Sequence, residues 1–337
     1  MTDISIKHMK ISIITPAFNE SSNLPLLYSE LKKNLDSIGM DWEWLIVDDH
    51  SSDNTYDVAS GMAGEDPRIK VWRFARNHGS HMALRCGFDN ATGDCAVVMA
   101  ADLQDPPETI PELVKKWREG FHVVWAVRKQ REGEKIFTLG FSRLYYFLMR
   151  KFVGLKEIPS TGADFFLIDK KVLNTLRQFK EANVSILALL TWIGFKQTSI
   201  FYNKKARIHG KSGWDFEKKL KLVADSITSF TYKPLRWMSY LGFLVALFGI
   251  GYSIYAIIYY FFLGSPVMGW TSLIVAVLIL GGLQMMMMGI LGEYLWRSLD
   301  ESRRRPRYII ECDASDQQPI QKEIKESSDD SDNKTAD

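Results

Sequence analysis

The stretch VVMAADLQDPPE, residues 97–108, carries an apolar run into a cluster of oxygen-bearing side chains. Asp102 supplies a carboxylate and Gln104 an amide oxygen, and ligands of this type suit Mg²⁺ and Mn²⁺. Ala100 stands where a metal site would use a further carboxylate. Because Mg²⁺ keeps several waters and binds substrate phosphates, one or two protein ligands are enough. We therefore predict a divalent-metal site at Asp102 and Gln104, and we expect Asp105 to begin the following helix.

Other polar clusters follow apolar runs earlier in the chain, and they read TPAFNE (15–20), DDHSSDNT (48–55) and RNHG (76–79). In the first cluster, Phe18 offers an aromatic ring. Glu20 either accepts hydrogen bonds from ribose hydroxyls or caps the next helix. The first cluster is therefore a candidate ligand-binding loop.

The cluster at 48–55 places two adjacent carboxylates at the end of a predicted strand. An aspartate there accepts a hydrogen bond from a base N–H, and we favour Asp49 over Asp48 for this role. We expect Asp53 instead to cap the following helix.

Basic side chains predict a second anion site. Arg128 and Arg131 follow the fifth predicted strand, and Arg207 and Lys211 lie in the loop RIHGKSGW. A guanidinium group donates hydrogen bonds in a fixed fork that matches phosphate oxygens. These residues are therefore candidates for binding the phosphate of an acceptor.

Strand–helix alternation over residues 10–200 positions these clusters. Apolar runs rich in β-branched or aromatic residues predict strands at 10–15, 42–49, 69–74, 95–100 and 122–127. Helical patterns lie near 21–39, 53–64, 79–91 and 107–119. This order is typical of a doubly wound α/β fold with a mostly parallel sheet, where ligands bind beyond the carboxyl ends of the strands. We therefore expect the polar clusters to share one edge of the sheet.

A long uncharged segment predicts a membrane hairpin. No Asp, Glu, Lys or Arg occurs between Trp237 and Gly292, and GSPVMG (264–269) divides the segment. Each half, about 237–263 and 269–292, exceeds the roughly 20 apolar residues that cross a bilayer. Lys and Arg flank the hairpin at both ends and are absent from its turn. The distribution predicts a multi-pass protein of the cell (inner) membrane, with the catalytic domain and both termini cytoplasmic.

Composition sets broad limits on the remaining possibilities. Three scattered cysteines form neither a zinc pattern nor a disulfide framework, and the N-terminus has no apolar signal region. Acidic residues dominate the end of the chain, so the rest carries a modest basic excess that fits a membrane or a phosphate-rich substrate rather than nucleic acid. The predicted parts are a cytosolic catalytic domain (1–210), an acceptor loop with an amphipathic interface helix (211–235), two transmembrane helices (236–296) and a disordered cytosolic tail, basic and then acidic (297–337).

The ordered motifs resemble the inverting nucleotide-sugar glycosyltransferases with a GT-A fold. The motifs are SIITPAFNE, VDDHSSDNT, ADLQDPPE, REGEKIFTLGFSRLYY (131–146), TGADFFLIDK (161–170) and RIHGKSGWDF (207–216). Together with the hairpin, they are similar to the polyprenyl-phosphate glycosyltransferase branch, which includes dolichol-phosphate mannose synthase and the bactoprenol glucosyltransferases. Many members of the family read DADLQ where this chain reads AADLQ.

The resemblance implies transfer of one sugar from a nucleotide diphosphate sugar, with a UDP-sugar favoured, to polyprenyl (undecaprenyl) phosphate. It implies a Mg²⁺ or Mn²⁺ cofactor, a role in cell-envelope glycan assembly or modification, and a homo-oligomer such as a tetramer. The implied nucleotide-sugar site comprises Pro16, Ala17, Phe18, Glu20, Asp48, Asp49, Ser51 and Asp102. The implied acceptor-phosphate site comprises Arg128, Arg131, Ser142, Arg207, Lys211 and Ser212.

The implied catalytic residues are Asp102, Asp164, Arg128 and Arg131. Asp164, in TGADF, resembles the position of an active-site carboxylate. It orients a substrate or pairs with one of the arginines. Residues 215–232 have apolar side chains at intervals of three or four and flanking lysines, which predicts a helix at the membrane interface. Packing of that helix onto the catalytic domain is the alternative.

Two other functions remain open. A processive polysaccharide synthase would carry a Gln-x-x-Arg-Trp motif, and the nearest match, KPLRW (233–237), lacks the glutamine. A catalytically silent scaffold that binds nucleotide sugar is supported by Ala100. Product length separates the first alternative from single-sugar transfer, and absence of any product separates the second.

Overall fold

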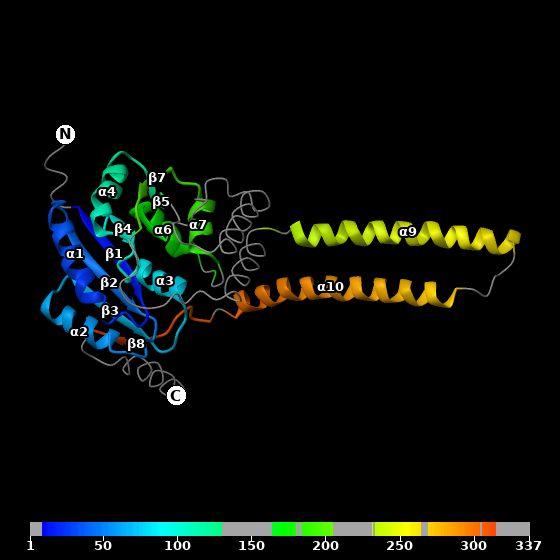
Figure 1. The fold of residues 1–337 in the computed structure, drawn as a ribbon, viewed down its shortest axis with the longest axis horizontal. Coiled ribbons are helices and arrows are strands. Elements are labelled where there is room, and N and C mark those ends of the chain that lie inside the picture. The colour runs from blue at the N-terminus through cyan, green and yellow to red at the C-terminus, as the bar shows by residue number, and fades with distance from the viewer. Residues whose placement is uncertain are drawn as a thin grey trace, which may run out of the picture. The chain divides into compact units, whose positions relative to one another are not determined.

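The protein is represented by a computed structural model that describes residues 9–129, 164–179, 181, 184–204, 231, 233–263, 269–303 and 305–314. The chain divides into two units, which are coloured by chain position in Figure 1. One unit comprises Met1–Leu220 and Pro306–Asp337, and the other comprises Lys221–Arg305. The expected interface helix at 215–232 lies outside the described residues except for Thr231.

An eight-stranded mixed sheet forms the centre of the first unit, with the order β7-β5-β6-β4-β1-β2-β3-β8. The pairs β4–β1, β1–β2, β2–β3 and β5–β7 are parallel, whereas β6 runs antiparallel to β4 and β5, and β8 runs antiparallel to β3. The strands are β1 (Lys10–Ala17), β2 (Asp41–Asp48), β3 (Ile69–Phe74), β4 (Cys95–Val98), β5 (Val123–Arg128), β6 (Phe165–Asp169), β7 (Gln197–Tyr202) and β8 (Ile310–Asp313).

Helices connect these strands and pack on the sheet. In this unit they are α1 (Leu24–Asp36), α2 (Thr55–Glu65), α3 (Ser80–Asn90), the 3₁₀ helix η2 (Pro107–Thr109), α4 (Ile110–Arg118), α6 (Lys170–Gln178) and α7 (Ile186–Ile193). α1 contacts α2 and α4, while α3 contacts α6, β1 and β2. The doubly wound α/β prediction is therefore confirmed, and each of the five predicted strands is present.

The periodicity of α1 explains how it is held on the sheet. Leu24, Leu27, Leu31 and Leu35 recur at intervals of three or four residues and are at most 1% exposed. Burial of each such side chain stabilises the fold by about 1.5–3 kcal/mol. On α3, Gly87 approaches β1 so closely that a Cβ atom there would lie 2.2 Å from Ile14 Cγ2.

The second unit contains two long helices, α9 (Lys233–Leu263) and α10 (Trp270–Ser302), which lie side by side and antiparallel in Figure 1. Tyr294 Oη donates to the carbonyl of Thr231 at 2.8 Å. Within the described part of the chain, only Leu235–Tyr252 meets the length and apolarity needed for a membrane span. Large apolar side chains on both helices are exposed, which is typical of helices surrounded by lipid.

The prediction of a disordered tail over 297–337 is wrong at its start. α10 continues to Ser302, and β8 pairs with β3. The physical reason is that β3 would otherwise be an edge strand with unpaired N–H and C=O groups, which a returning segment satisfies. Residues 315–337 lie outside the described residues.

Candidate functional site

The loops after β1 and β2 are joined by hydrogen bonds at the carboxyl edge of the sheet. The Asn19 N–H donates to Ser51 Oγ at 2.9 Å, and the Ser52 N–H donates to Asn19 Oδ1 at 2.9 Å. The Asp49 N–H donates to the carbonyl of Ala17 at 2.9 Å. The first two polar clusters therefore form one connected structure, as the strand order predicted.

Asp53 links the same two loops and also serves the following helix. Its Oδ2 accepts from Ser21 Oγ at 2.7 Å, and its Oδ1 accepts from the N–H of Thr55, the first residue of α2, at 3.0 Å. Asn54 occupies the N-cap position but makes no side-chain cap bond. Asp53 thus performs the capping role predicted for it.

Asp48 and Asp49 are both buried, and each supports a turn. Asp48 Oδ1 accepts from the N–H of Ser51 at 3.1 Å and from its hydroxyl. Asp49 accepts from the N–H groups of His78 at 2.6 Å and Gly79 at 2.8 Å, which joins the β3–α3 loop to the same edge. Burial outweighs these two bonds and raises the pKa of Asp49 to about 6. Burial also raises the pKa of Asp48.

Phe18 and Glu20 lie on the exposed side of the β1 loop. The Phe18 ring is 48% exposed and is free to stack against a flat ligand, whereas Ala17 is buried and Pro16 is the penultimate residue of β1. The Glu20 carboxylate accepts from the side-chain amide of Asn23, and its carbonyl accepts from the Asn23 N–H at 2.9 Å. Glu20 therefore helps to begin α1, which does not prevent ribose binding.

Backbone strain gathers in these loops. Asn19, His50 and Leu103 have φ values of 58°, 61° and 58°, a left-handed conformation that costs non-glycine residues about 1 kcal/mol or more. They are the non-glycine residues of positive φ in the described part of the chain, and each lies in a loop predicted to carry function. Such concentration of strain is typical of binding and catalytic sites.

The loop after β4 contains the predicted metal ligands. Asp102 is 4% exposed, and its Oδ1 accepts from the Gln104 N–H at 3.2 Å across Leu103. Among the described residues, no three His, Cys, Asp or Glu side chains gather around one point. The metal site at Asp102 and Gln104 stays a prediction, and one carboxylate with one amide oxygen would suit a hard cation that completes its shell with phosphate and water oxygens.

Asp164 and Arg128 meet at the same edge from neighbouring strands. Because β6 runs antiparallel to β4 and β5, its first residues lie beside the strand ends that carry the other loops. Arg128 Nη2 lies 3.5 Å from Asp164 Oδ2, and the Asp164 side chain is 64% exposed. Burial alone would lower the pKa of Arg128, but the nearby charge of Asp164 acts in the opposite direction, and the pKa of Arg128 is raised. The pairing alternative for Asp164 is thus present, and its carboxylate also remains accessible to a substrate.

The expectation that Asp105 begins a helix is wrong. Pro106 precedes η2 and Thr109 is the N-cap of α4, whereas Asp105 is 1% exposed. Its Oδ1 accepts from Tyr202 Oη at 2.5 Å and lies 3.9 Å from Lys204 Nζ. Burial raises the pKa of Asp105. This carboxylate connects the β4 loop to β7, a connection between residues far apart in the sequence.

Several predicted site residues lie outside the described residues, and their roles remain predictions. They are Arg131, Ser142, Arg207, Lys211 and Ser212.

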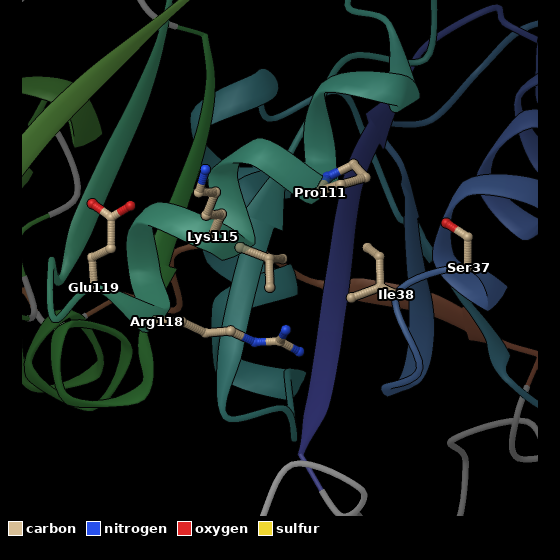
Figure 2. Close-up of a pocket in the computed structure, with 7 residues that line it drawn as sticks. Ser37, Ile38, Pro111, Lys115, Arg118 and Glu119 are labelled. Carbon is tan, nitrogen blue, oxygen red and sulfur yellow. The ribbon is translucent and has the colours of Figure 1, made fainter. Parts of the chain in front are cut away.

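A surface depression elsewhere on the catalytic unit contains none of the predicted residues. Figure 2 shows it between the end of α1 and helix α4, lined by Ser37, Ile38, Pro111, Val114, Lys115, Arg118 and Glu119. Ser37 and Ile38 precede β2, and Glu119 precedes β5, so this part of the lining lies near the amino ends of those strands. It is separate from the strand edge that carries the clustered carboxylates.

Comparison with known proteins gives matches along most of the chain. Residues 12–177 match the family model for glycosyl transferase family 2, and residues 233–297 match the model for the GtrB C-terminal hairpin. The uncharacterized glycosyltransferase YkcC of Bacillus subtilis (strain 168) is 38% identical over 305 residues, covering 90% of this chain and 94% of that protein. The bactoprenol glucosyl transferase of Shigella phage SfV is 34% identical over 302 residues, covering 90% of this chain and 98% of that protein.

Among solved structures, glucosyl-3-phosphoglycerate synthase from Mycobacterium tuberculosis, in complex with Mn²⁺, UDP-glucose and phosphoglyceric acid, is similar with a TM-score of 0.47 at 15% identity. That similarity covers 64% of this chain and 78% of that chain. From the sequence matches, the chain belongs to glycosyl transferase family 2 and is a glycosyltransferase with a GtrB-type C-terminal hairpin.

Proposed function

We propose that this glycosyltransferase moves one sugar from a nucleotide diphosphate sugar, with UDP-sugars preferred, to polyprenyl phosphate. The observation that carries the proposal is the edge where the β1, β2 and β4 loops lie beside the Asp164–Arg128 pair. The name of the bactoprenol glucosyl transferase relative supports a polyprenyl acceptor, and the match to the model for the GtrB C-terminal hairpin supports membrane association. The product would serve cell-envelope glycan assembly or modification.

The donor side is assigned to the joined β1 and β2 loops. The exposed Phe18 ring offers a stacking surface for the base, and Asp49 or Asp48 accepts from a base N–H. Pro16, Ala17, Glu20 and Ser51 shape this loop structure. Asp102 and Gln104 would hold a divalent cation between the diphosphate and the protein. When bound, such a cation neutralises the negative charge that develops on the departing diphosphate.

The acceptor side is assigned to Arg128 with Arg131, Ser142, Arg207, Lys211 and Ser212. The lipid phosphate is anionic at neutral pH, so its oxygen can attack the sugar C1 without strong general-base assistance. The new bond joins C1 to that phosphate oxygen while the bond from C1 to the nucleotide diphosphate breaks, which inverts the configuration. Arg128 orients the incoming phosphate, and Asp164 positions Arg128 and the sugar.

The membrane arrangement is proposed from charge and hydropathy. The two long helices form a transmembrane hairpin, with the catalytic unit and both chain ends on the cytoplasmic side. Residues 211–235 supply the acceptor loop and an interface helix, and the protein forms a homo-oligomer. This arrangement leaves the isoprenoid tail in the bilayer while its phosphate reaches the cytosolic site.

The test uses purified full-length protein, undecaprenyl phosphate and a panel of radiolabelled UDP- and GDP-sugars, with Mg²⁺, Mn²⁺ or EDTA. We expect a lipid-soluble product carrying one sugar, formed only with metal present. A ladder of products would instead identify a processive synthase. If no donor gives product although UDP binds, the chain is a nucleotide-sugar-binding scaffold, which Ala100 would explain.

A further inference from the structure

After the hairpin, the chain returns to the catalytic sheet. Residues 305–314, here called the C-terminal strap, contain β8, which lies beside β3 in Figure 1. The Ala75 N–H donates to the carbonyl of Ile309 at 2.9 Å, and the Ala314 N–H donates to the carbonyl of Val71 at 3.0 Å. Trp72 Nε1 donates to Asp313 Oδ2 at 2.8 Å. β8, at the end of the strap, is therefore an integral strand of the sheet.

Aromatic and polar contacts fix the strap before β8 begins. The Tyr308 ring stacks on Phe74 with centroids 5.2 Å apart, and Tyr308 Oη donates to Asp89 Oδ2 at 3.1 Å. Arg307 donates to the carbonyl of Phe179. These contacts join the start of the strap to β3, to α3 and to the residue that follows α6, whereas Glu311 is placed by the pairing of β8 with β3.

Glu311 reaches the proposed nucleotide site through one arginine. Arg73 Nε lies 3.2 Å from Glu311 Oε2 and 3.8 Å from Asp48 Oδ2. Arg73 Nη2 also donates to the carbonyl of Ser51 at 3.4 Å. Asp48 Oδ2 is buried without a hydrogen-bond partner in the described part of the chain, so Arg73 is the cation that faces its charge. His50 Nδ1 lies 3.8 Å from Glu311 Oε2 as well.

We propose that Arg73 and Glu311 are positioning residues for the nucleotide, because they hold the Asp48–Ser51 turn from the side of the C-terminal strap. The turn passes this constraint to the β1 loop, since Ser51 Oγ receives the N–H of Asn19, next to Phe18. Donor binding thus depends on a residue that follows the membrane hairpin in the chain. This inference rests on the proposed function of the turn as part of the nucleotide site.

The experiment compares full-length wild type, Glu311→Gln and Tyr308→Phe. Tyr308→Phe removes the hydroxyl bond to Asp89 and keeps the ring on Phe74, and we expect it to leave the contacts of Arg73 with Glu311, Asp48 and Ser51 in place. Hydrogen exchange is measured at residues 17–23 and 48–55 without ligand, and UDP-glucose binding is measured by calorimetry. We expect faster exchange in both loops and about two- to five-fold weaker binding in Glu311→Gln only, the range for a partly exposed ion pair.

Two further variants separate positioning from general damage. Arg73→Lys keeps the charge and should weaken UDP-glucose binding less than Arg73→Gln, which leaves Asp48 buried without a counter-charge. For Glu311→Gln, KM for the donor should rise while kcat at saturating donor stays unchanged. Unchanged loop exchange in Glu311→Gln, or an equal change in Tyr308→Phe, overturns the inference. A wild type that binds no nucleotide contradicts the proposed function, and loop exchange still decides whether Glu311 holds the turn.

Discussion

Replacing Asp102 is the most direct test of the proposed metal chemistry. Replacing it with Asn removes the negative ligand but keeps the side-chain shape, and we expect transfer to fall by about 100-fold or more, since metal-assisted charge neutralisation supplies several kcal/mol. Sugar transfer and Mn²⁺ binding by electron paramagnetic resonance are measured together. Asp57→Asn, an exposed carboxylate on α2, is the matched control and should change neither. Full activity in Asp102→Asn would exclude a metal role for this residue.

The raised pKa of Asp49 predicts a pH dependence of donor binding. Burial raises its pKa to about 6, so the ionised acceptor is present above pH 6 and is lost as the pH falls below that value. Affinity for UDP-glucose, whose diphosphate does not titrate in this range, should fall by up to about tenfold per pH unit below 6. Calorimetry between about pH 5 and pH 8, a range that spans the titration of Asp49, measures the affinity for UDP-glucose. Asp49→Asn should bind more weakly and show no such change, and a wild type with flat affinity would argue against Asp49 as the base acceptor.

The residues found only in the structure are those whose partners lie far away in the chain. Proline neighbours made Asp105 look like a helix start, but its burial depends on Tyr202, a residue of β7. Arg73 alternates with buried residues on β3 and gave no signal, because Asp48 and Glu311 come from other strands. The positions of Asp102, Gln104 and Asp49 after β4 and β2 could be predicted, since strand ends in a parallel sheet share an edge, whereas their roles in binding stay predictions.

At the level of elements, Glu43 on β2 joins neighbouring strands near their amino ends. Lys10 Nζ donates to it at 2.8 Å, Ser12 Oγ at 2.7 Å and the Thr92 N–H at 2.7 Å. Burial raises the pKa of Glu43, but these bonds outweigh it and lower the pKa to about 2. A depressed carboxyl pKa stabilises the fold above pH 4.5, the unfolded value, and this stabilisation is lost as the pH falls toward 2.

Glu43→Gln should therefore lower the free energy of unfolding by about 3 kcal/mol at neutral pH, with a difference from wild type that shrinks below pH 4.5. Chemical denaturation followed by tryptophan fluorescence measures it. Glu30→Gln, on the exposed face of α1, is the control and should leave stability nearly unchanged. A constant difference across the acid range would mean that packing, rather than charge, accounts for the loss.

Elements that bury an apolar face were predictable, and those defined by a neighbour were not. The β-branched and apolar residues of IVDD and AVVM predict strands, and the leucine spacing of α1 predicts a helix. β8 reads IECD within an acidic tail and becomes a strand because β3 offers an edge. β6 was part of a recognised motif, but its antiparallel direction depends on the pairing of β4 and β5 around it.

At the level of the whole molecule, the apolar residues in the middle of the long helices predict membrane association. Leu247 lies in the Leu235–Tyr252 stretch and is 56% exposed. An arginine near the centre of a spanning helix costs about 2.5–3.5 kcal/mol on the insertion scale. We expect Leu247→Arg to reduce the membrane-bound fraction after cell fractionation. Leu26→Arg, at a leucine of α1 that is 45% exposed, introduces the same charge in the catalytic unit and should leave that fraction unchanged.

The order of the elements has a consequence for biosynthesis. α9 and α10 are translated after β7 and before β8, so the edge of β3 has no neighbour until the hairpin has left the ribosome. An open strand edge readily pairs with other chains and favours aggregation. The sheet is therefore completed only after both hairpin helices exist. A nascent chain that stops early would carry an association-prone edge, which would distinguish it for quality control from a finished enzyme.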